Sequence, residues 1–113
     1  MGVFPLEIDY YSTRDGKRPF KAWLDGLRDV TARAKIRVRL DRARLGNLGD
    51  YRAVGGGVNE LRVDYGPGYR VYFAIENRRL LLLLLGGDKS SQQRDISTAR
   101  EYWQDYLERK EHG

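Results

Sequence analysis

The fold is decided by a stretch in the middle of the chain, Glu60-Leu61-Arg62-Val63-Asp64-Tyr65-Gly66-Pro67-Gly68-Tyr69-Arg70-Val71-Tyr72-Phe73. Apolar and polar residues alternate on both sides of Gly66-Pro67-Gly68, which is typical of two antiparallel strands joined by a tight turn. We therefore predict a β-hairpin with strands over about residues 58–65 and 69–76 and a three-residue loop at 66–68.

The alternation also assigns the hairpin side chains to two faces, because successive residues of a strand point to opposite sides. With this loop, Tyr65 pairs with Tyr69 and Asp64 with Arg70, while Arg62 pairs with Tyr72. One face is then apolar and is expected to join the core. The other face carries Glu60, Arg62, Asp64, Arg70 and Tyr72.

Two interpretations of this charged face stay open. It can be a solvated face with cross-strand ion pairs. It can also be a site for an anion, because the arginine guanidinium matches the geometry of phosphate. In the second case Lys89, in a loop after the third predicted strand, would add a further positive charge.

The rest of the chain adds one strand before the hairpin, one strand directly after it, and three helices. Residues 3–10 alternate, with Phe4 on the apolar side, and Pro5 places this strand near an edge of the sheet. Six leucines, 80–85, are apolar on both faces and predict an interior strand. Helices are expected over 19–29, over 32–45 with Thr31 as its cap, and from a cap at Ser90 or Ser91 to about Arg109, with loops at 50–57 and 86–89.

The predicted order is β-α-α-β-β-β-α, in one domain of residues 1–113. This order predicts an α+β fold with a mostly antiparallel sheet, two N-terminal helices and a C-terminal helix.

Composition narrows the chemistry that the chain can perform. Of 113 residues, 33% are charged, and the net charge of +5 favours an anionic partner. Cysteine is absent and His112 is the only histidine, so neither a Cys/His zinc site nor a Ser-His-Asp site can be built. Acid–base chemistry must use Lys, Arg, Tyr, Asp or Glu, and we expect no metal and no cofactor. The leucine run is too short to cross a membrane, so we expect a cytoplasmic protein with no membrane partner.

The second predicted helix is strongly basic along both sides of its apolar stripe. Lys35, Arg39 and Arg42 lie along one side, and three further arginines lie along the other. These side chains can follow a nucleic-acid backbone. They can equally extend their aliphatic stems beside the apolar stripe with the charged ends in water.

Four segments carry a resemblance to a known family: Glu60-Leu61-Arg62, then Gly66 to Tyr72, then Leu83 to Ser90, and finally Gln92, Asp95, Ile96 and Ala99. In these segments the chain resembles HigB-like addiction-module killer proteins of the RelE/ParE toxin superfamily. The resemblance implies a type II toxin encoded beside an antitoxin, usually a helix-turn-helix (HigA-like) protein. RelE-like members cut mRNA on the ribosome, whereas ParE-like members inhibit DNA gyrase. We expect a ribosome-dependent mRNA interferase, with a gyrase inhibitor or an inactive protein-binding module as alternatives.

The resemblance also implies roles for individual residues. Arg70 matches the arginine of the Gly-Tyr-Arg motif and would stabilise the transition-state phosphate, with Arg62 and Lys89 at positions where basic residues are usual. Ser90 stands where classical RelE has a second loop arginine. Ile96 stands near the place of the catalytic tyrosine of RelE, so Tyr72 or Tyr65 would take the role of that tyrosine. The general base would be Glu60, Asp64, Asp88 or Lys89, because arginine stays protonated. The expected catalytic residues are Glu60, Arg62, Arg70, Tyr72 and Lys89, and the expected RNA-binding residues are Lys35, Arg39, Arg42, Arg62, Arg70 and Lys89.

Overall fold

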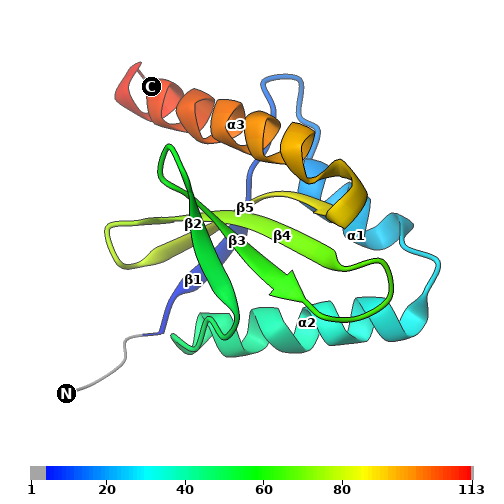
Figure 1. Ribbon diagram of the computed structural model, residues 1–113. Coiled ribbons are helices and arrows are strands. Elements are labelled where there is room, and N and C mark those ends of the chain that lie inside the picture. Colours follow the sequence, from blue (N-terminus) through cyan, green and yellow to red (C-terminus); the bar gives the residue numbers. More distant parts are fainter. Residues whose placement is uncertain (1–4, 113) are drawn as a thin grey trace.

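The computed structural model describes residues 5–112, which form a five-stranded sheet with helices on both faces (Figure 1). The elements follow in the order β1 (Glu7–Tyr10), α1 (Pro19–Gly26), α2 (Val30–Arg44), β2 (Tyr51–Gly55), β3 (Val58–Val63), β4 (Tyr69–Glu76), β5 (Leu80–Asp88), the short 3₁₀ turn η1 (Lys89–Ser91) and α3 (Gln92–His112). The predicted α+β class, with the last helix at the C-terminal end, is confirmed.

The strand order in the sheet is β1-β5-β4-β3-β2. All neighbours are antiparallel except β1, which pairs with β5 in parallel. The leucine-rich strand β5 therefore has a neighbour on each side, as its apolar faces predicted. β1 lies at an edge, as Pro5 predicted, whereas Phe4 lies outside the described residues.

The prediction of a loop over residues 50–57 is wrong, because Tyr51–Gly55 forms strand β2 and pairs with β3. This strand lies at the edge of the sheet and most of its residues are exposed, so it has no apolar alternation. Gly55, Gly56 and Gly57 make the turn into β3 with φ of 91°, 64° and 85°, a backbone region that favours glycine.

The predicted register of the central hairpin is wrong by two residues. β3 ends at Val63, which pairs with Tyr69, so Arg62 faces Arg70 and Glu60 faces Tyr72. The connection is five residues long, with Gly66 and Gly68 at φ of 56° and 80°. Because the side-chain period of a strand is two, this shift leaves every predicted face unchanged.

Several boundaries also differ from the prediction. Gly86, Gly87 and Asp88 belong to β5 rather than to a loop. α1 ends at Gly26, and α2 begins at Val30 because Asp29, not Thr31, caps it by accepting a hydrogen bond from the Ala32 amide at 3.1 Å. Neither Ser90 nor Ser91 caps the last helix: Asp88 caps the 3₁₀ turn before it, and α3 extends to His112.

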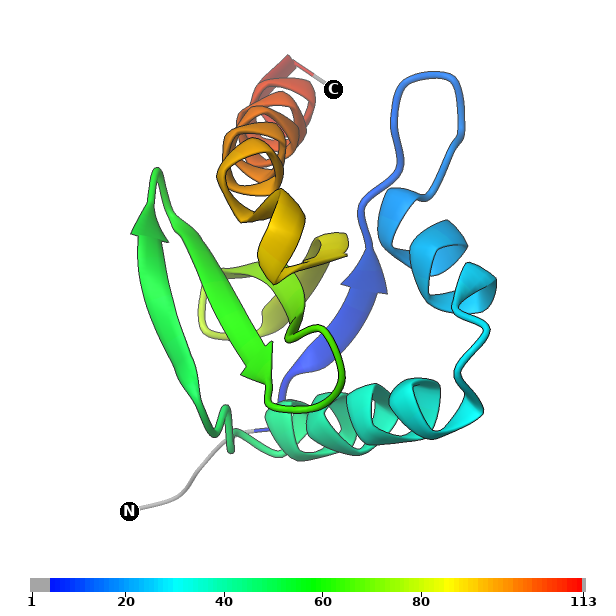
Figure 2. The ribbon, with the colours of Figure 1, turned by 45° about the vertical axis from the view of Figure 1, so that its right-hand side comes forward.

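Helices lie on both faces of the sheet (Figures 1 and 2), and an apolar layer fills the space on each side. α1 and α2 cover one face, where Phe20 and Ile36 pack against buried residues of β3, β4 and β5. α3 covers the other face, where Ala99 and Trp103 pack with Tyr72. On the charged face of the hairpin, Glu60 and Tyr72 are therefore buried beneath α3, whereas Arg62 and Asp64 remain open to solvent. Among the described residues, no helix is both long and apolar enough to span a bilayer.

Close packing of α1 on β5 yields a first prediction. A Cβ at buried Gly86 would overlap ring atoms of Trp23. We expect Gly86→Ala to lower the free energy of unfolding by about 1–3 kcal/mol, as measured by urea denaturation. Gly26→Ala is the control, because a Cβ at Gly26 meets nothing within 4 Å. Equal stability of the two variants would contradict the packing described for Gly86.

Candidate functional site

Three basic residues, two from neighbouring strands and one from the turn after β5, converge at one end of the sheet. Arg62 on β3 faces Arg70 on β4, and Lys89 directly follows β5. They lie around an open pocket of about 370 Å³ that we call the cationic pocket. Its lining consists of Asp50, Arg62, Asp64, Gly66, Pro67, Gly68, Arg70 and Lys89.

A buried carboxylate, Glu60, holds the arginine side chains from beneath. Its Oε1 accepts hydrogen bonds from Nε of Arg52 at 3.1 Å and from Nε of Arg62 at 3.4 Å. Nε of Arg70 lies 3.8 Å from the same oxygen. The other oxygen, Oε2, accepts from the Tyr72 hydroxyl at 3.2 Å and from the Gln92 amide at 2.7 Å. We call this group the Glu60 cluster: Glu60, Arg52, Arg62, Arg70, Tyr72 and Gln92.

The surroundings of Glu60 decide its protonation state. Burial raises the pKa of Glu60, but hydrogen bonds from Gln92, Arg52 and Tyr72 outweigh this effect and hold the pKa below its ordinary value. Burial raises the pKa of Tyr72 well above its usual range, and the charge of Glu60 raises it further. At neutral pH Glu60 is therefore an anion and Tyr72 a neutral hydrogen-bond donor.

Five predicted catalytic residues come together here, but they differ in exposure. Arg62 is partly exposed and Lys89 is exposed, whereas the side chain of Arg70 is 12% exposed. Glu60 and Tyr72 are both 0% exposed, so neither presents an atom to the pocket. These two residues are placed to position the arginines and not to touch a bound molecule.

Other predicted proton acceptors and tyrosines have separate surroundings. Asp64 is exposed and lines the cationic pocket. The carboxylate of Asp88 accepts a hydrogen bond from the Ser90 hydroxyl, which lowers the pKa of Asp88. Tyr65 lies beneath the ammonium group of Lys35, which is 5.2 Å from the centre of its ring.

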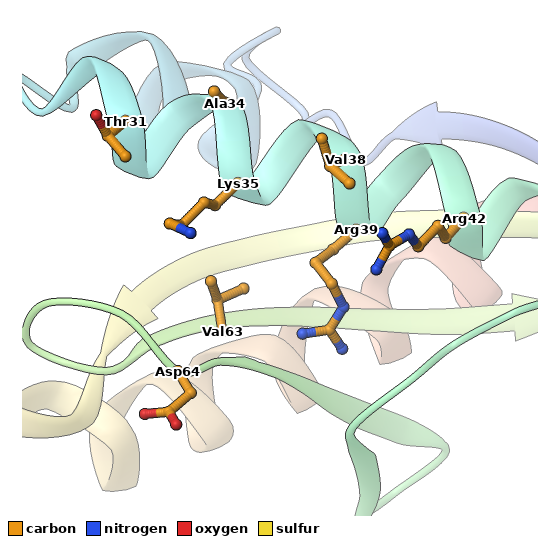
Figure 3. A pocket seen from close by; sticks show the side chains of 8 residues that line it. All are labelled: Thr31, Ala34, Lys35, Val38, Arg39, Arg42, Val63 and Asp64. Atoms are coloured by element: carbon orange, nitrogen blue, oxygen red, sulfur yellow. The ribbon is translucent and has the colours of Figure 1, made fainter.

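The basic residues of α2 do not join the cationic pocket. Lys35, Arg39 and Arg42 line a separate hollow of about 430 Å³ between α2 and the end of β3 (Figure 3). Arg39 donates hydrogen bonds to the carbonyl oxygens of Leu48 at 3.2 Å and Asp50 at 3.1 Å, and also to that of Arg62. It thereby ties the segment before β2 to the end of β3.

Sequence reasoning missed Arg52 as a member of the site. Arg52 lies on β2, opposite Glu60 in the register, within the segment 50–57 that the sequence pattern predicts as a loop. The signal that could have found it is the polar pair Arg52 and Glu60 at equal distances from the three-glycine turn. Gln92 belongs to a motif of the family resemblance, but its contact with Glu60 depends on how α3 packs.

Comparison with known proteins places the chain in a family. Residues 22–104 match the family model described as phage-derived protein Gp49-like (DUF891). The chain is also 48% identical over 81 residues to an uncharacterized protein of Haemophilus influenzae, which covers 72% of this chain and 82% of that relative. The matched residues of the family model run from α1 into α3 and include the cationic pocket and the Glu60 cluster. The chain therefore belongs to the Gp49-like family, an addiction-module toxin family of the RelE and HigB type in which an antitoxin partner is implied.

Proposed function

We propose that the protein is a HigB-like toxin of a type II toxin-antitoxin system that cleaves mRNA on the ribosome. The observation that carries this proposal is the cationic pocket, in which Arg62, Arg70 and Lys89 converge while the buried Glu60 holds both arginines. Guanidinium groups fixed in advance are suited to the charge that develops on a phosphate during cleavage.

The reaction we propose is internal transesterification of RNA. The ribose 2′-oxygen attacks the adjacent phosphorus, the bond from phosphorus to the 5′-oxygen breaks, and a 2′,3′-cyclic phosphate forms. The 2′-hydroxyl proton passes to a base, and the leaving 5′-oxygen receives a proton from an acid. Arg62 and Arg70 bind the phosphate oxygens and stabilise their growing negative charge.

Exposure narrows the choice of proton-transferring groups. Glu60 and Tyr72 are fully buried, so we assign them no proton transfer to or from the RNA. Asp64 lines the pocket and is exposed, and we assign it the removal of the 2′-hydroxyl proton. The ammonium group of Lys89 is assigned the donation of a proton to the 5′-oxygen. Every role falls to a side chain, so the proposed enzyme is a metal-independent endoribonuclease without a cofactor.

The partners follow from the same proposal. The substrate is translated mRNA held on the ribosome. The antitoxin is a helix-turn-helix protein of the HigA type, encoded beside the toxin.

A matched pair of double variants tests the proposal. Induction of the wild type in bacteria is expected to arrest growth and to fragment translated mRNA. Arg62→Ala with Lys89→Ala is expected to slow cleavage at least about 100-fold, because the two more exposed cations of the pocket are removed. Arg14→Ala with Lys17→Ala removes the same charge from side chains that are 68% and 80% exposed and lie outside the pocket, so it is expected to behave as the wild type.

The outcomes separate the alternatives, provided that circular dichroism shows each variant to be folded. Growth arrest with intact mRNA would reject the interferase and favour inhibition of DNA gyrase. No arrest by the wild type would leave a protein-binding module on a toxin fold. Equal loss in both double variants would show that total charge, and not the cationic pocket, matters.

A further inference from the structure

Helix α2 carries a second apolar stripe on the side that faces away from the core. Its core stripe consists of Ala32, Ile36, Leu40 and Ala43, all buried. Residues 30, 34 and 38 of the helix, and the C-cap residue 45 that directly follows it, lie at helical spacing on the opposite side, since an offset of two residues is about half a turn. We call Val30, Ala34, Val38 and Leu45 the outer stripe.

The outer stripe is unusually exposed for apolar residues. Val30 is 67% exposed, Val38 46% and Leu45 64%. Together with Tyr51 at the start of β2, they are the large apolar residues that stand out as exposed in the described part of the chain. Single exposed apolar residues are common on proteins, but a row of them at helical spacing indicates a contact surface.

Basic side chains border the outer stripe on both sides. By the helical period, Arg33, Arg37 and Arg44 lie along one side, and Lys35 and Arg42 lie along the other. Asp41 is the single acidic residue of α2, against six basic ones, and the same period places it between Val38 and Leu45. The surface therefore combines an apolar stripe, interrupted by one carboxylate, with a strongly positive border.

A hollow runs beside the outer stripe and widens the surface that a partner can contact. It lies between α2 and the end of β3, and Ala34, Val38 and Val63 give it apolar walls (Figure 3). Lys35 extends from α2 towards Val63 in this view, while the carboxylate of Asp64 projects away from the helix. Arg39 is engaged with backbone carbonyl oxygens and holds the wall in place.

We propose that the outer stripe of α2 is the docking site for an acidic amphipathic helix of the antitoxin. Apolar side chains of that helix would cover Val30, Val38 and Leu45, and its carboxylates would pair with the basic residues on both sides. A second copy of this chain is disfavoured, because two such helices would bring like charges together. An RNA strand is disfavoured as well, because phosphates gain nothing from the apolar centre. The inference rests on the antitoxin partner that the family implies, and not on nuclease activity.

A peptide titration followed by nuclear magnetic resonance tests the docking site. The probe is a synthetic helix of about 15 residues, the length of α2, with leucine along one side and glutamate on the others. We expect it to shift the backbone amide signals of residues 30–45 in the ¹⁵N-labelled protein. A peptide with lysine in place of glutamate is expected not to bind.

Two variants add the same charge at different places. Val38→Asp places a carboxylate in the outer stripe and is expected to weaken peptide binding by at least about tenfold, with the fold retained because the position is half-exposed. Ser97→Asp adds the charge at an exposed position of α3 and is expected to bind as the wild type. No binding by the wild type, or equal binding by Val38→Asp, overturns the proposal.

Further outcomes separate this inference from the proposed function. Shifts at Arg62, Arg70 and Lys89 in place of α2 would overturn the docking site, and so would an oligouridylate that shifts the amides of the outer stripe. In cells, Val38→Asp is expected to arrest growth like the wild type and to escape neutralisation by the co-expressed antitoxin. If the protein binds the peptide as expected but is not toxic in cells, the result contradicts the proposed function and leaves the docking site standing.

Discussion

Replacement of Arg70 by alanine is expected to slow mRNA cleavage by a factor of about 100 to 1,000. Arg70 is the most enclosed arginine of the cationic pocket, with a side chain that is 12% exposed. Its Nη1 donates to the carbonyl oxygens of Gly68 at 3.2 Å and Tyr69 at 3.4 Å, and its Nε faces Glu60. A guanidinium held in this way keeps its orientation before the phosphate arrives, so its loss removes charge stabilisation that neighbouring side chains cannot replace.

A lysine at this position tests geometry separately from charge. Arg70→Lys keeps the positive charge but loses the planar group that contacts the loop and the phosphate together. We expect it to recover less than about a tenth of the wild-type rate. Cleavage is measured by primer extension on ribosome-bound mRNA, with urea denaturation as the control for folding. Growth arrest by folded Arg70→Ala equal to that of the wild type would remove Arg70 from the proposed mechanism.

Removal of the charge of Glu60 is expected to have the second large effect, on stability. Glu60→Gln leaves Arg52, Arg62 and Arg70 close together without their shared counter-charge. Breaking a buried ion pair costs about 3–5 kcal/mol, and we expect a loss near 3 kcal/mol because Arg52 and Arg62 are 50% and 37% exposed. Urea denaturation at neutral pH measures the difference. Glu101→Gln, at an exposed position of α3, is the control and is expected to change stability little.

The pH dependence of the free energy of unfolding provides a second test of the charge of Glu60. The pKa of Glu60 is lower in the folded protein than its ordinary value of 4.5, so the folded state favours the ionised form. The contribution of Glu60 to stability is therefore fully present above pH 4.5 and is lost as the pH falls through the folded pKa. The stability gap between wild type and Glu60→Gln is expected to be constant near neutrality and to shrink below pH 4.5. A gap that is unchanged in acid would contradict the ionised state assigned to Glu60.

The alternation of side chains along a strand is a robust local signal. The hairpin register was wrong by two residues, yet Arg62 and Arg70 were placed on the correct face, because side chains repeat every two residues. Apolar residues on both faces of the segment 80–85 predicted that β5 is an interior strand. In contrast, the edge strand β2 was missed, since an exposed strand needs no apolar pattern and depends on hydrogen bonds to β3. Arg52 was lost from the predicted site for that reason.

Local sequence patterns were sufficient to predict the α+β class, the order of most elements, and the charged face that carries Arg62, Arg70 and Tyr72. Each of these depends on patterns within a few neighbouring residues, which the chain carries locally. Tertiary packing was needed to establish that α3 covers Glu60 and Tyr72, that Glu60 is fully buried, and that Gln92 completes its hydrogen bonds. It also decided that the basic residues of α2 border a separate apolar surface. These properties depend on contacts between segments far apart in the chain, and the energy of such contacts is set by packing and burial, which local patterns do not encode.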